Sequence, residues 1–413
     1  MTDVQRVPID DWATDFDHTH PDYAARAPEV WDELRERCPV AHSERQGGMW
    51  LPTRHADVAA IAHDTVQFSS EGVIVSPFKP DGLAPQGYAP PITSDPPFHA
   101  EARRLLLPAF SPKEVAKLEG AARASCRELL DEALADGTGL VDAARQYAQH
   151  IPVRVIAQML GLPREDGDRF RTWIHRIIEN PGGNGAVAYE DTLFYYLGQM
   201  VEDHRAHRRE DLIGFLIDAE MDGKPLATEH IVGTIGLLLI AGIDTTWSAI
   251  GASLWHLAQS PDDRKRLVDD PGVLPFAVEE MLRFYAPVTM ARIVAGDDVE
   301  VGGEVLGHRD WVLLPFPAAN RDPEAFERAD EFVIDRERNR HVAFGLGIHR
   351  CLGSNLARLE LTVAVDEWMR RIPDFELSDP GAVLWSTGQV RGPRQLPVRV
   401  LETRPAESKG ADA

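Results

Sequence analysis

The sequence predicts a mainly α-helical protein with small β-sheets, built as a single domain over residues 1–402. Long segments carry apolar residues three and four positions apart, which is the pattern of a helix with one buried face. Segments with strand-like patterns are short and few. No change in composition marks a domain boundary, and we expect only the tail, residues 403–413, to be flexible.

Two amphipathic helices are predicted over residues 28–39 and 111–134, the second with Ser111 as N-cap and Pro112 in its first turn. A longer helix is predicted over residues 231–257. Its uninterrupted apolar part ends at Asp244, short of the roughly 20 residues that cross a bilayer. We therefore expect a buried helix of a protein that does not enter a membrane.

Strands are expected near residue 50 and between residues 298 and 316, where Gly302 and Gly303 mark a hairpin turn. Residues 72–97 and 179–192 are rich in proline and glycine and interrupt the helical pattern. Long irregular segments inside a compact domain are more often ligand-binding loops than linkers. We expect both segments to border a binding site.

The formal net charge of −23 excludes nucleic acid and anionic membranes as general partners, because both favour a basic surface. The first residues lack the charged-then-apolar order of a signal peptide, so we expect a cytoplasmic protein. Cys38, Cys126 and Cys351 form no CxxC pair and are expected to be free thiols.

The segment FGLGIHRCLG, residues 344–353, places a cysteine among glycines directly before a helical pattern. Amide groups at a helix N-terminus stabilise an anion, which favours a thiolate at Cys351. The glycines would let the backbone approach a flat, bulky group. A zinc site is disfavoured because no paired ligands accompany the cysteine. Taken alone, Cys351 could also be a buried structural residue.

Two further segments stand out. AGIDTT, residues 241–246, places residues that are poor mid-helix formers inside the long apolar helix, which indicates either a functional site or a packing compromise. EEMLRF, residues 279–284, sets Glu280 and Arg283 three positions apart, so that they can form a salt bridge. A solvated surface pair has the same spacing.

The spacing of Phe344, Gly347, His349, Cys351 and Gly353 resembles F-x-x-G-x-[HR]-x-C-x-G, the haem-ligand signature of the cytochrome P450 superfamily. This resemblance implies the P450 fold, with haem b between the long distal helix and the helix after the cysteine loop. It implies that Cys351 is the axial ligand of the haem iron. Phe344 would shield the sulfur, His349 would contact a propionate, and Gly353 would lie against the cofactor.

AGIDTT resembles the distal-helix motif of the same family. By this resemblance Ala241 lies over the haem, Thr245 donates a hydrogen bond during oxygen activation, and Asp244 relays solvent protons. DPPFHAEARR, residues 95–104, matches the family pattern that assigns His99 and Arg103 to the haem propionates. Arg292 matches a third propionate partner.

Glu280 and Arg283 resemble the structural E-x-x-R pair of the family. The arginine that usually completes this network would fall in the segment RADEFVIDR, where Glu331 stands at that position. Arg336 is the candidate to replace it. The closure of the network is left open by the sequence.

The resemblance implies a monooxygenase that uses O2 and two external electrons. A separate iron–sulfur ferredoxin with an NAD(P)H-dependent reductase is the expected donor, since no flavin or iron–sulfur motif is found. Arg103, Arg104, Arg350 and Arg358 could form a basic docking patch for it, or two of them could serve only structure. Two alternatives remain: a haem-binding sensor or carrier, and chemistry without oxygen insertion.

The expected substrate is a hydrophobic small molecule such as a terpenoid, an aromatic compound or a steroid. By position in the family, the pocket is expected to draw on five mainly apolar residues. These are Phe78, Ile240, Val288, Met290 and Trp385.

Overall fold

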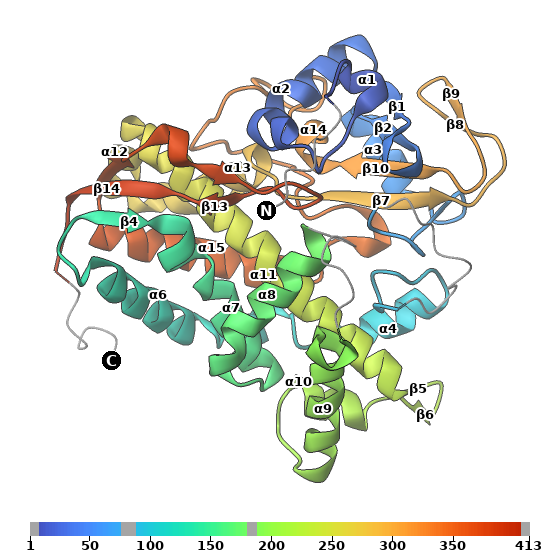
Figure 1. Ribbon diagram of the computed structural model, residues 1–413, viewed down its shortest axis with the longest axis horizontal. Coiled ribbons are helices and arrows are strands. Elements are labelled where there is room, and N and C mark those ends of the chain that lie inside the picture. Colours follow the sequence, from blue (N-terminus) through green and yellow to red (C-terminus); the bar gives the residue numbers. More distant parts are fainter. Residues whose placement is uncertain (1–7, 76–87, 180–187, 406–413) are drawn as a thin grey trace.

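The computed structural model describes residues 8–75, 88–179 and 188–405. Phe78, much of the two predicted binding loops and most of the predicted tail lie outside the described residues. The described part is mainly helical, with short strands gathered into small sheets (Figure 1). This agrees with the fold class predicted from the sequence.

The helices are α1 (Trp12–Asp15), α2 (Pro21–Arg37), α3 (His55–His63), α4 (Phe98–Leu106), α5 (Pro112–Ala116), α6 (Glu119–Leu134), α7 (His150–Leu160), α8 (Gly167–Ile178), α9 (Leu193–Ala206), α10 (Leu212–Asp218), α11 (Thr228–Gln259), α12 (Pro261–Asp269), α13 (Leu274–Phe284), α14 (Phe316–Ala319) and α15 (Ser354–Arg371). The strands are β1 (Val40–Ser43), β2 (Met49–Pro52), β3 (Phe68–Ser69), β4 (Leu140–Asp142), β5 (Glu220–Met221), β6 (Lys224–Pro225), β7 (Thr289–Val294), β8 (Val299–Val301), β9 (Glu304–Leu306), β10 (Trp311–Pro315), β11 (Asp374–Leu377), β12 (Leu384–Trp385), β13 (Pro393–Gln395) and β14 (Pro397–Glu402).

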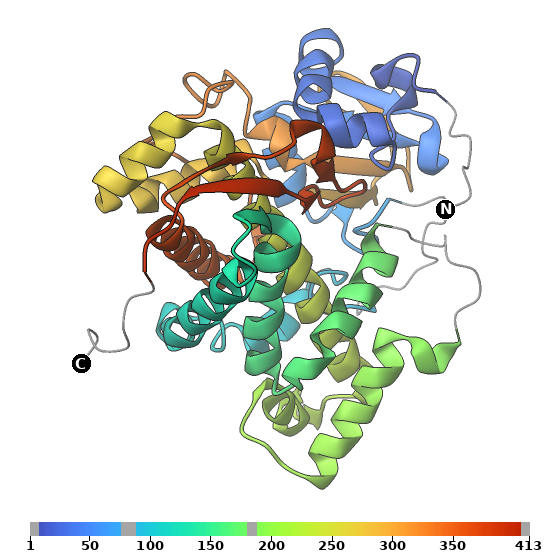
Figure 2. The same cartoon turned by 60° about the vertical axis from the view of Figure 1, so that its left-hand side comes forward.

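The main sheet has the strand order β1-β2-β10-β7-β3 and lies beside α2 and α14, apart from the large helical layer (Figures 1 and 2). β10 is its central strand, antiparallel to β7 and parallel to β2. All five residues of β10 are buried, as expected for a strand covered on both faces. The segment after β10 reaches the cysteine loop, so this sheet helps to place that loop.

Helix α11 runs through the centre of the helical layer and packs against α7, α9 and α15 (Figure 1). Its 32 residues make it about 48 Å long. An 18-residue window of α11 is apolar enough to cross a membrane, but 67% of that window is buried inside the protein. The prediction of a long buried helix is therefore confirmed.

The structure refines two of the predicted helices. Residues 111–134 form two helices, α5 and α6, and the Ser111 side chain makes no capping hydrogen bond. The predicted helix at residues 28–39 is the second part of α2, which has a non-helical residue at Arg26 just before Pro28. Pro28 has no backbone N–H and its ring crowds the preceding turn, which accounts for the kink.

The predicted hairpin is confirmed. Strands β8 and β9 pair antiparallel, and Gly302 and Gly303 connect them. Both glycines have positive φ, +58° and +91°, a conformation that suits glycine far better than other residues.

Candidate active site

The cysteine loop joins the region after β10 to helix α15. A 3-10 turn over Gly347–His349 precedes Cys351, and Gly353 is the N-cap residue of α15. The Cys351 N–H donates to the Phe344 carbonyl oxygen at 2.7 Å, which closes the loop. The Gly353 N–H donates towards the Cys351 sulfur. The loop therefore presents a thiol at the start of a helix, as the sequence predicts.

Two of the loop glycines are required by the protein itself. Gly345 and Gly347 have φ of +66° and +65°. A Cβ atom at Gly347 would lie 2.2 Å from the Ala62 carbonyl oxygen. Gly353 is different, because a Cβ there would meet its nearest neighbours, in Phe110 and Cys351, at ordinary contact distances of 3.9 and 4.0 Å. The described residues therefore leave room for a side chain at Gly353. Glycine would be required here if a further group, such as a bound cofactor, lay against this position.

Burial raises the pKa of the Cys351 thiol, and this effect outweighs the hydrogen bond from Gly353 and the positive charges of Arg103, Arg350 and Arg358. The helix start favours the thiolate, as the sequence predicts, but on its own it does not offset the effect of burial. Coordination to a metal deprotonates a thiol directly. The donors around the sulfur then help to stabilise the anion.

Phe344 packs against a partly exposed ion pair between Arg358 and Glu279. The guanidinium carbon of Arg358 lies 4.5 Å from the centre of the Phe344 ring. Arg358 donates to both oxygens of Glu279, at 2.6 and 2.9 Å. Phe344 is thereby fixed beside the cysteine loop, and Arg358 is committed to this contact.

Four donor or cationic side chains predicted to bind propionates are brought together from separate elements. His99 and Arg103 lie on successive turns of α4, Arg292 lies on β7, and His349 belongs to the cysteine loop. The rings of His99 and His349 are 4.3 Å apart. Arg103 donates to the carbonyl oxygen of Arg350, which ties α4 to the cysteine loop.

The described carboxylates do not balance the positive charges of this cluster, and Asp95 is the carboxylate that acts on His99 and Arg292. Burial and the neighbouring arginines lower the pKa of His99 to about 4 and of His349 to about 2. Burial lowers the pKa of Arg292 to about 10 despite the charge of Asp95, and the Arg292 guanidinium donates to the Ala291 carbonyl oxygen at 2.7 Å. The Nε2 atom of His99 is buried without a partner in the described part. Buried donors in such a state fit an anionic ligand, and the two haem propionates have this chemistry.

A second feature predicted to contact the cofactor is a face of α11. Most of this helix is buried, yet Ala241 is exposed, and Leu237 and Thr245 are partly exposed. These three residues are four positions apart and so lie on one face of the helix. An uncovered, mainly apolar stripe in the middle of a core helix fits a flat hydrophobic cofactor.

Asp244 and Thr245 are adjacent on α11 but differ in environment. The Thr245 hydroxyl donates to the Ala241 carbonyl oxygen at 2.7 Å, within its own helix. Asp244 is 2% exposed, and its Oδ1 accepts from Arg394 at 2.8 Å. Its Oδ2 is buried without a partner among the described residues. Burial raises the pKa of Asp244 to about 6, which suits a group that takes up and releases protons.

Glu280 and Arg283 form a fully buried pair and not a surface one. Two nitrogens of Arg283 donate to the two Glu280 oxygens at 2.7 and 2.8 Å, and both side chains are 0% exposed. Arg336 donates to Glu280 at 3.0 Å and so completes the network, while Glu331 contributes only its carbonyl oxygen. The question left open by the sequence is answered in favour of Arg336.

The described members of the predicted pocket come from three elements. Ile240 lies next to Ala241 on α11, and Val288 and Met290 lie at β7, all partly buried. Trp385 on β12 packs against Trp255 of α11 and against Arg391. Trp255 follows Thr245 by ten residues, about 15 Å along the helix.

The segment after the undescribed part of the first loop reaches α11. Thr234 donates to the Pro90 carbonyl oxygen at 3.3 Å, and a Cβ at Gly233 would lie 2.4 Å from the Tyr88 carbonyl oxygen. Residues 88–90 therefore pack closely on the N-terminal half of α11. This placement agrees with the prediction that the loop borders the binding site.

Two residues at the site were missed by the sequence analysis. Arg394 on β13 binds Asp244, and Glu360 on α15 accepts a hydrogen bond from Thr246. Burial raises the pKa of Glu360 to about 8. Neither residue lies in a recognisable motif, and each meets its partner only through the tertiary fold.

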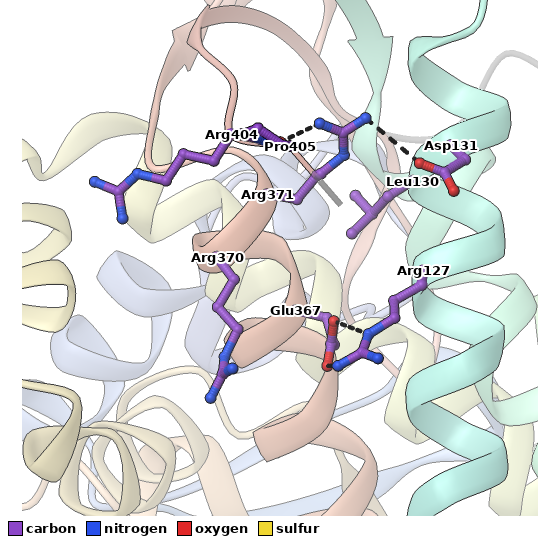
Figure 3. A pocket seen from close by; sticks show the side chains of 8 residues that line it. All are labelled: Arg127, Leu130, Asp131, Glu367, Arg370, Arg371, Arg404 and Pro405. Atoms are coloured by element: carbon purple, nitrogen blue, oxygen red, sulfur yellow. Dashed lines mark hydrogen bonds and ion pairs between the residues drawn. The ribbon is translucent and has the colours of Figure 1, made fainter. Parts of the chain in front are cut away.

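A separate hollow lies between α6 and α15 (Figure 3). It is lined by four arginines, two carboxylates, a leucine and a proline: Arg127, Leu130, Asp131, Glu367, Arg370, Arg371, Arg404 and Pro405. It lies at the C-terminal end of α15, whereas Cys351 precedes its N-terminal end. None of the predicted site residues lines it, so it is distinct from the site described above.

A cysteine at a helix start, an uncompensated cationic cluster and an uncovered face of the long helix together define a haem-thiolate protein. The residues present fit this cofactor. The sequence model for cytochrome P450 matches residues 170–270 and 272–381.

Curated relatives and solved structures agree with this assignment. The chain is 33% identical over 377 residues to a mycinamicin IV hydroxylase/epoxidase of Micromonospora griseorubida, covering 89% of this chain and 94% of that protein. It is 35% identical over 408 residues to nocardicin C N-oxygenase of Nocardia uniformis subsp. tsuyamanensis, covering 96% and 99%. The structure resembles CYP109E1 of Bacillus megaterium in complex with testosterone, with a TM-score of 0.83, 31% identity and coverage of 93% and 100%.

The chain belongs to the cytochrome P450 family, and it is a P450 monooxygenase with the haem-thiolate cofactor of that family.

Proposed function

We propose that this protein inserts one atom of O2 into a hydrophobic small organic molecule, with Cys351 as the axial ligand of its haem iron. Two features support the proposal together. One is the Cys351 loop with its cationic cluster, and the other is the α11 face at Ala241 and Thr245. Haem bound between them would supply the iron centre at which O2 is reductively activated.

The residues of the chain have distinct roles in this proposal. Phe344 and Gly353 lie against the cofactor beside the Cys351 sulfur. His99, Arg103, Arg292 and His349 hold the propionates, because they are buried or partly buried donors with few anionic partners. The Glu280–Arg283 pair with Arg336 fixes the segment that leads to the cysteine loop.

Asp244 and Thr245 are the proposed proton-handling pair. Asp244 has one buried oxygen, Oδ2, without a described partner, and burial raises its pKa to about 6. It can therefore take up a proton near neutral pH and release it. Thr245 offers a hydroxyl one residue away, whose present hydrogen bond to Ala241 is local and can be exchanged for one to a bound ligand.

The substrate is proposed to be a terpenoid, an aromatic compound or a steroid. The expected pocket residues Ile240, Val288 and Met290 are apolar, and the relatives named above are a hydroxylase/epoxidase and an N-oxygenase. A structural relative was solved with testosterone. A screen of compounds for a spin-state change in the haem spectrum would identify the class, and a purely hydrophilic set of binders would contradict it.

Electrons are proposed to come from an iron–sulfur ferredoxin and an NAD(P)H-dependent reductase in the cytoplasm. Arg104 and Arg350 are exposed near the cysteine loop, whereas Arg358 is occupied by Glu279. An acidic ferredoxin would dock on the exposed pair. The rate of reduction should fall steeply with added salt, and this dependence should weaken in Arg104→Glu.

The decisive test is the spectrum of the reduced carbonyl complex. Thiolate ligation predicts a strongly red-shifted Soret band that is lost in Cys351→Ser and kept in the control Cys38→Ser. An imidazole-like spectrum of the wild type would contradict the ligand assignment. Turnover in labelled dioxygen should add one labelled oxygen to the product. A product without added oxygen would favour the alternative of non-oxygenating chemistry, and no substrate-dependent NAD(P)H use would favour a sensor.

A further inference from the structure

Arg394 joins three segments that are far apart in the sequence. Its Nη2 donates to Oδ1 of Asp244 on α11 at 2.8 Å, and its Nη1 donates to the Ser248 hydroxyl at 3.0 Å. Its Nε donates to Glu179, the residue that follows α8, at 2.5 Å. The guanidinium also lies 4.2 Å from the centre of the Trp247 ring. Each of the three guanidinium nitrogens of Arg394 therefore donates a hydrogen bond, and the guanidinium plane also contacts an aromatic ring.

The backbone around Arg394 is fixed by close packing of β13 on α11. A Cβ atom at Gly392 would lie 2.3 Å from the Ser248 Cβ, so only glycine allows this approach. One turn further along α11, Gly251 faces Pro393, with a Cβ contact of 3.2 Å. The position of the guanidinium is therefore set by the fold and not by a flexible loop.

The charges around Asp244 form a chain that reaches the surface. Arg394 lies between the carboxylates of Asp244 and Glu179. His175, one turn before Glu179 on α8, has its Nδ1 3.3 Å from the second Glu179 oxygen. The His175 side chain is 62% exposed, whereas that of Asp244 is 3% exposed. Arg394, Glu179 and His175 are the charged or titratable groups that act on Asp244.

We propose that Arg394 is a positioning residue for proton delivery: it holds Oδ1 of Asp244 and leaves Oδ2 as the oxygen that takes up and gives off the proton. Glu179 weakens the attraction between Arg394 and Asp244, because it binds the same guanidinium. His175 reduces the effect of the Glu179 charge, because it lies beside that carboxylate. The proton comes from hydronium in solvent, which becomes water as the O–H bond forms at Oδ2. The O–H bond at Oδ2 later breaks as this proton passes to the Thr245 hydroxyl oxygen, which gives its own proton to a bound water molecule, and no electron moves in either step. This inference rests on the role proposed above for Asp244.

The electrostatics of Asp244 agree with this arrangement. Burial and the Glu179 charge raise its pKa, while Arg394 and His175 lower it, and the result is about 6. Removing Arg394 and removing the Glu179 charge should therefore have opposite effects on the protonation of Asp244. A side chain that only supported the fold would not produce a pair of shifts with opposite signs.

The test is an infrared pH titration of the protonated carboxyl group in the ferric, haem-loaded protein, with Asp244→Asn used to assign the signal. Arg394→Gln should raise the proton affinity of Asp244 at least tenfold. Glu179→Gln should lower it by at least threefold. The matched control is Arg399→Gln, which removes an exposed arginine of β14 whose partner is Glu376 at 3.9 Å, and it should leave the titration unchanged.

Shifts of the same sign in both variants, or no shift in either, would overturn the proposal. If Arg394→Gln does not fold, Arg394→Lys keeps the charge but cannot reach all three partners. It should keep the midpoint within about threefold of wild type while releasing more peroxide per NAD(P)H consumed. A tenfold change in the proton affinity of Asp244 in Arg394→Lys, as expected for loss of the charge, would contradict that expectation.

The titration needs neither substrate nor electron donor, so it remains valid if the proposed reaction fails. Opposite shifts without a change in peroxide release in Arg394→Gln support positioning by Arg394 and contradict the role of Asp244 in turnover. If the titration is unshifted in both variants but the protein is an active monooxygenase, the positioning role of Arg394 is contradicted and the proposed function is not.

Discussion

Asp244 and Arg394 lie 150 positions apart in the sequence and meet at 2.8 Å. The first belongs to the middle of the long core helix and the second to a short strand near the end of the described chain. Their contact couples a helix that was recognisable from its motif to a strand that carries no motif. The protonation of Asp244 therefore depends on a residue that only the tertiary fold brings beside it.

Thr245→Ala is expected to uncouple electron use from product formation. Removing the hydroxyl takes away the donor that follows Asp244 on the exposed face of α11, without creating a large cavity. We expect the share of NAD(P)H that ends as peroxide to rise at least threefold, measured by peroxide and product yields. Ser253→Ala is the control, because the Ser253 hydroxyl makes the same kind of bond to Ala249 on the same helix, at 2.8 Å. Equal uncoupling in both variants would contradict the role of Thr245.

Arg292→Met is expected to weaken haem retention without weakening the fold. Arg292 is 5% exposed and burial lowers its pKa to about 10, so the protein itself is destabilised by this charge. Its replacement by a neutral side chain should keep or raise the free energy of unfolding, while the rate of haem transfer to an excess acceptor protein rises about tenfold.

The matched control for Arg292 is Arg264, a buried arginine that does have partners. It donates to Asp374 at 2.7 Å and to the Leu257 carbonyl oxygen at 2.6 Å. Arg264→Met should lower the free energy of unfolding by about 1–2 kcal/mol and leave haem transfer unchanged. The reverse pattern in the two variants would show that the Arg292 cluster does not bind the propionates.

Glu280→Ala is expected to be strongly destabilising. It would leave Arg283, which is 0% exposed, without its carboxylate, and Arg336 would lose the same partner. Breaking a buried pair from one side costs about 3–5 kcal/mol, measurable as a lower urea midpoint. The exposed pair Arg328–Glu331 is the comparison, and Arg328→Ala should leave the midpoint within experimental error. Similar losses in both would place Glu280 in a solvated environment.

Glu360→Gln is expected to stabilise the protein at high pH. Burial raises the pKa of Glu360 to about 8 from 4.5, so the folded state binds its proton more tightly than the unfolded state does. Stability contributed by this proton is present below about pH 4.5 and is lost as the pH rises towards 8. The amide carries no charge to lose.

The gain in unfolding free energy from Glu360→Gln should be about 2–4 kcal/mol near pH 9 and vanish near pH 4. It is measured by urea unfolding across the pH range. Glu376→Gln, at an exposed position on β11, should show no such trend. A gain that did not depend on pH would point to packing and not to the buried charge.

The elements with local signals were predictable from the sequence. The apolar run of α11, the Gly302–Gly303 turn and the cysteine loop each depend on residues within a few positions of one another. The split between α5 and α6 was not predictable, because the amphipathic pattern continues across the break and only packing decides it.

The site itself was predictable only in part. Motif positions placed Asp244, Thr245 and Cys351 correctly on their elements, but their protonation depends on partners brought by the tertiary fold. Arg394 follows Gly392 and Pro393 in a short segment without hydrophobic periodicity. Glu360 lies within an ordinary amphipathic helical pattern. The helix start does favour a thiolate at Cys351, as expected, but the sequence does not show the larger opposing effect. Burial, which the sequence does not show, acts more strongly on Cys351 than the helix does.

The packing of Gly392 on Ser248 has a consequence for synthesis of the chain. Residues are added from the N-terminus, so α11 leaves the ribosome long before β13 exists. Until then Asp244 has no guanidinium beside it, and full burial of its ionised form is unfavourable. The core helix therefore reaches its final packing late, and the last strands of the fold bring the charge that lets its centre close.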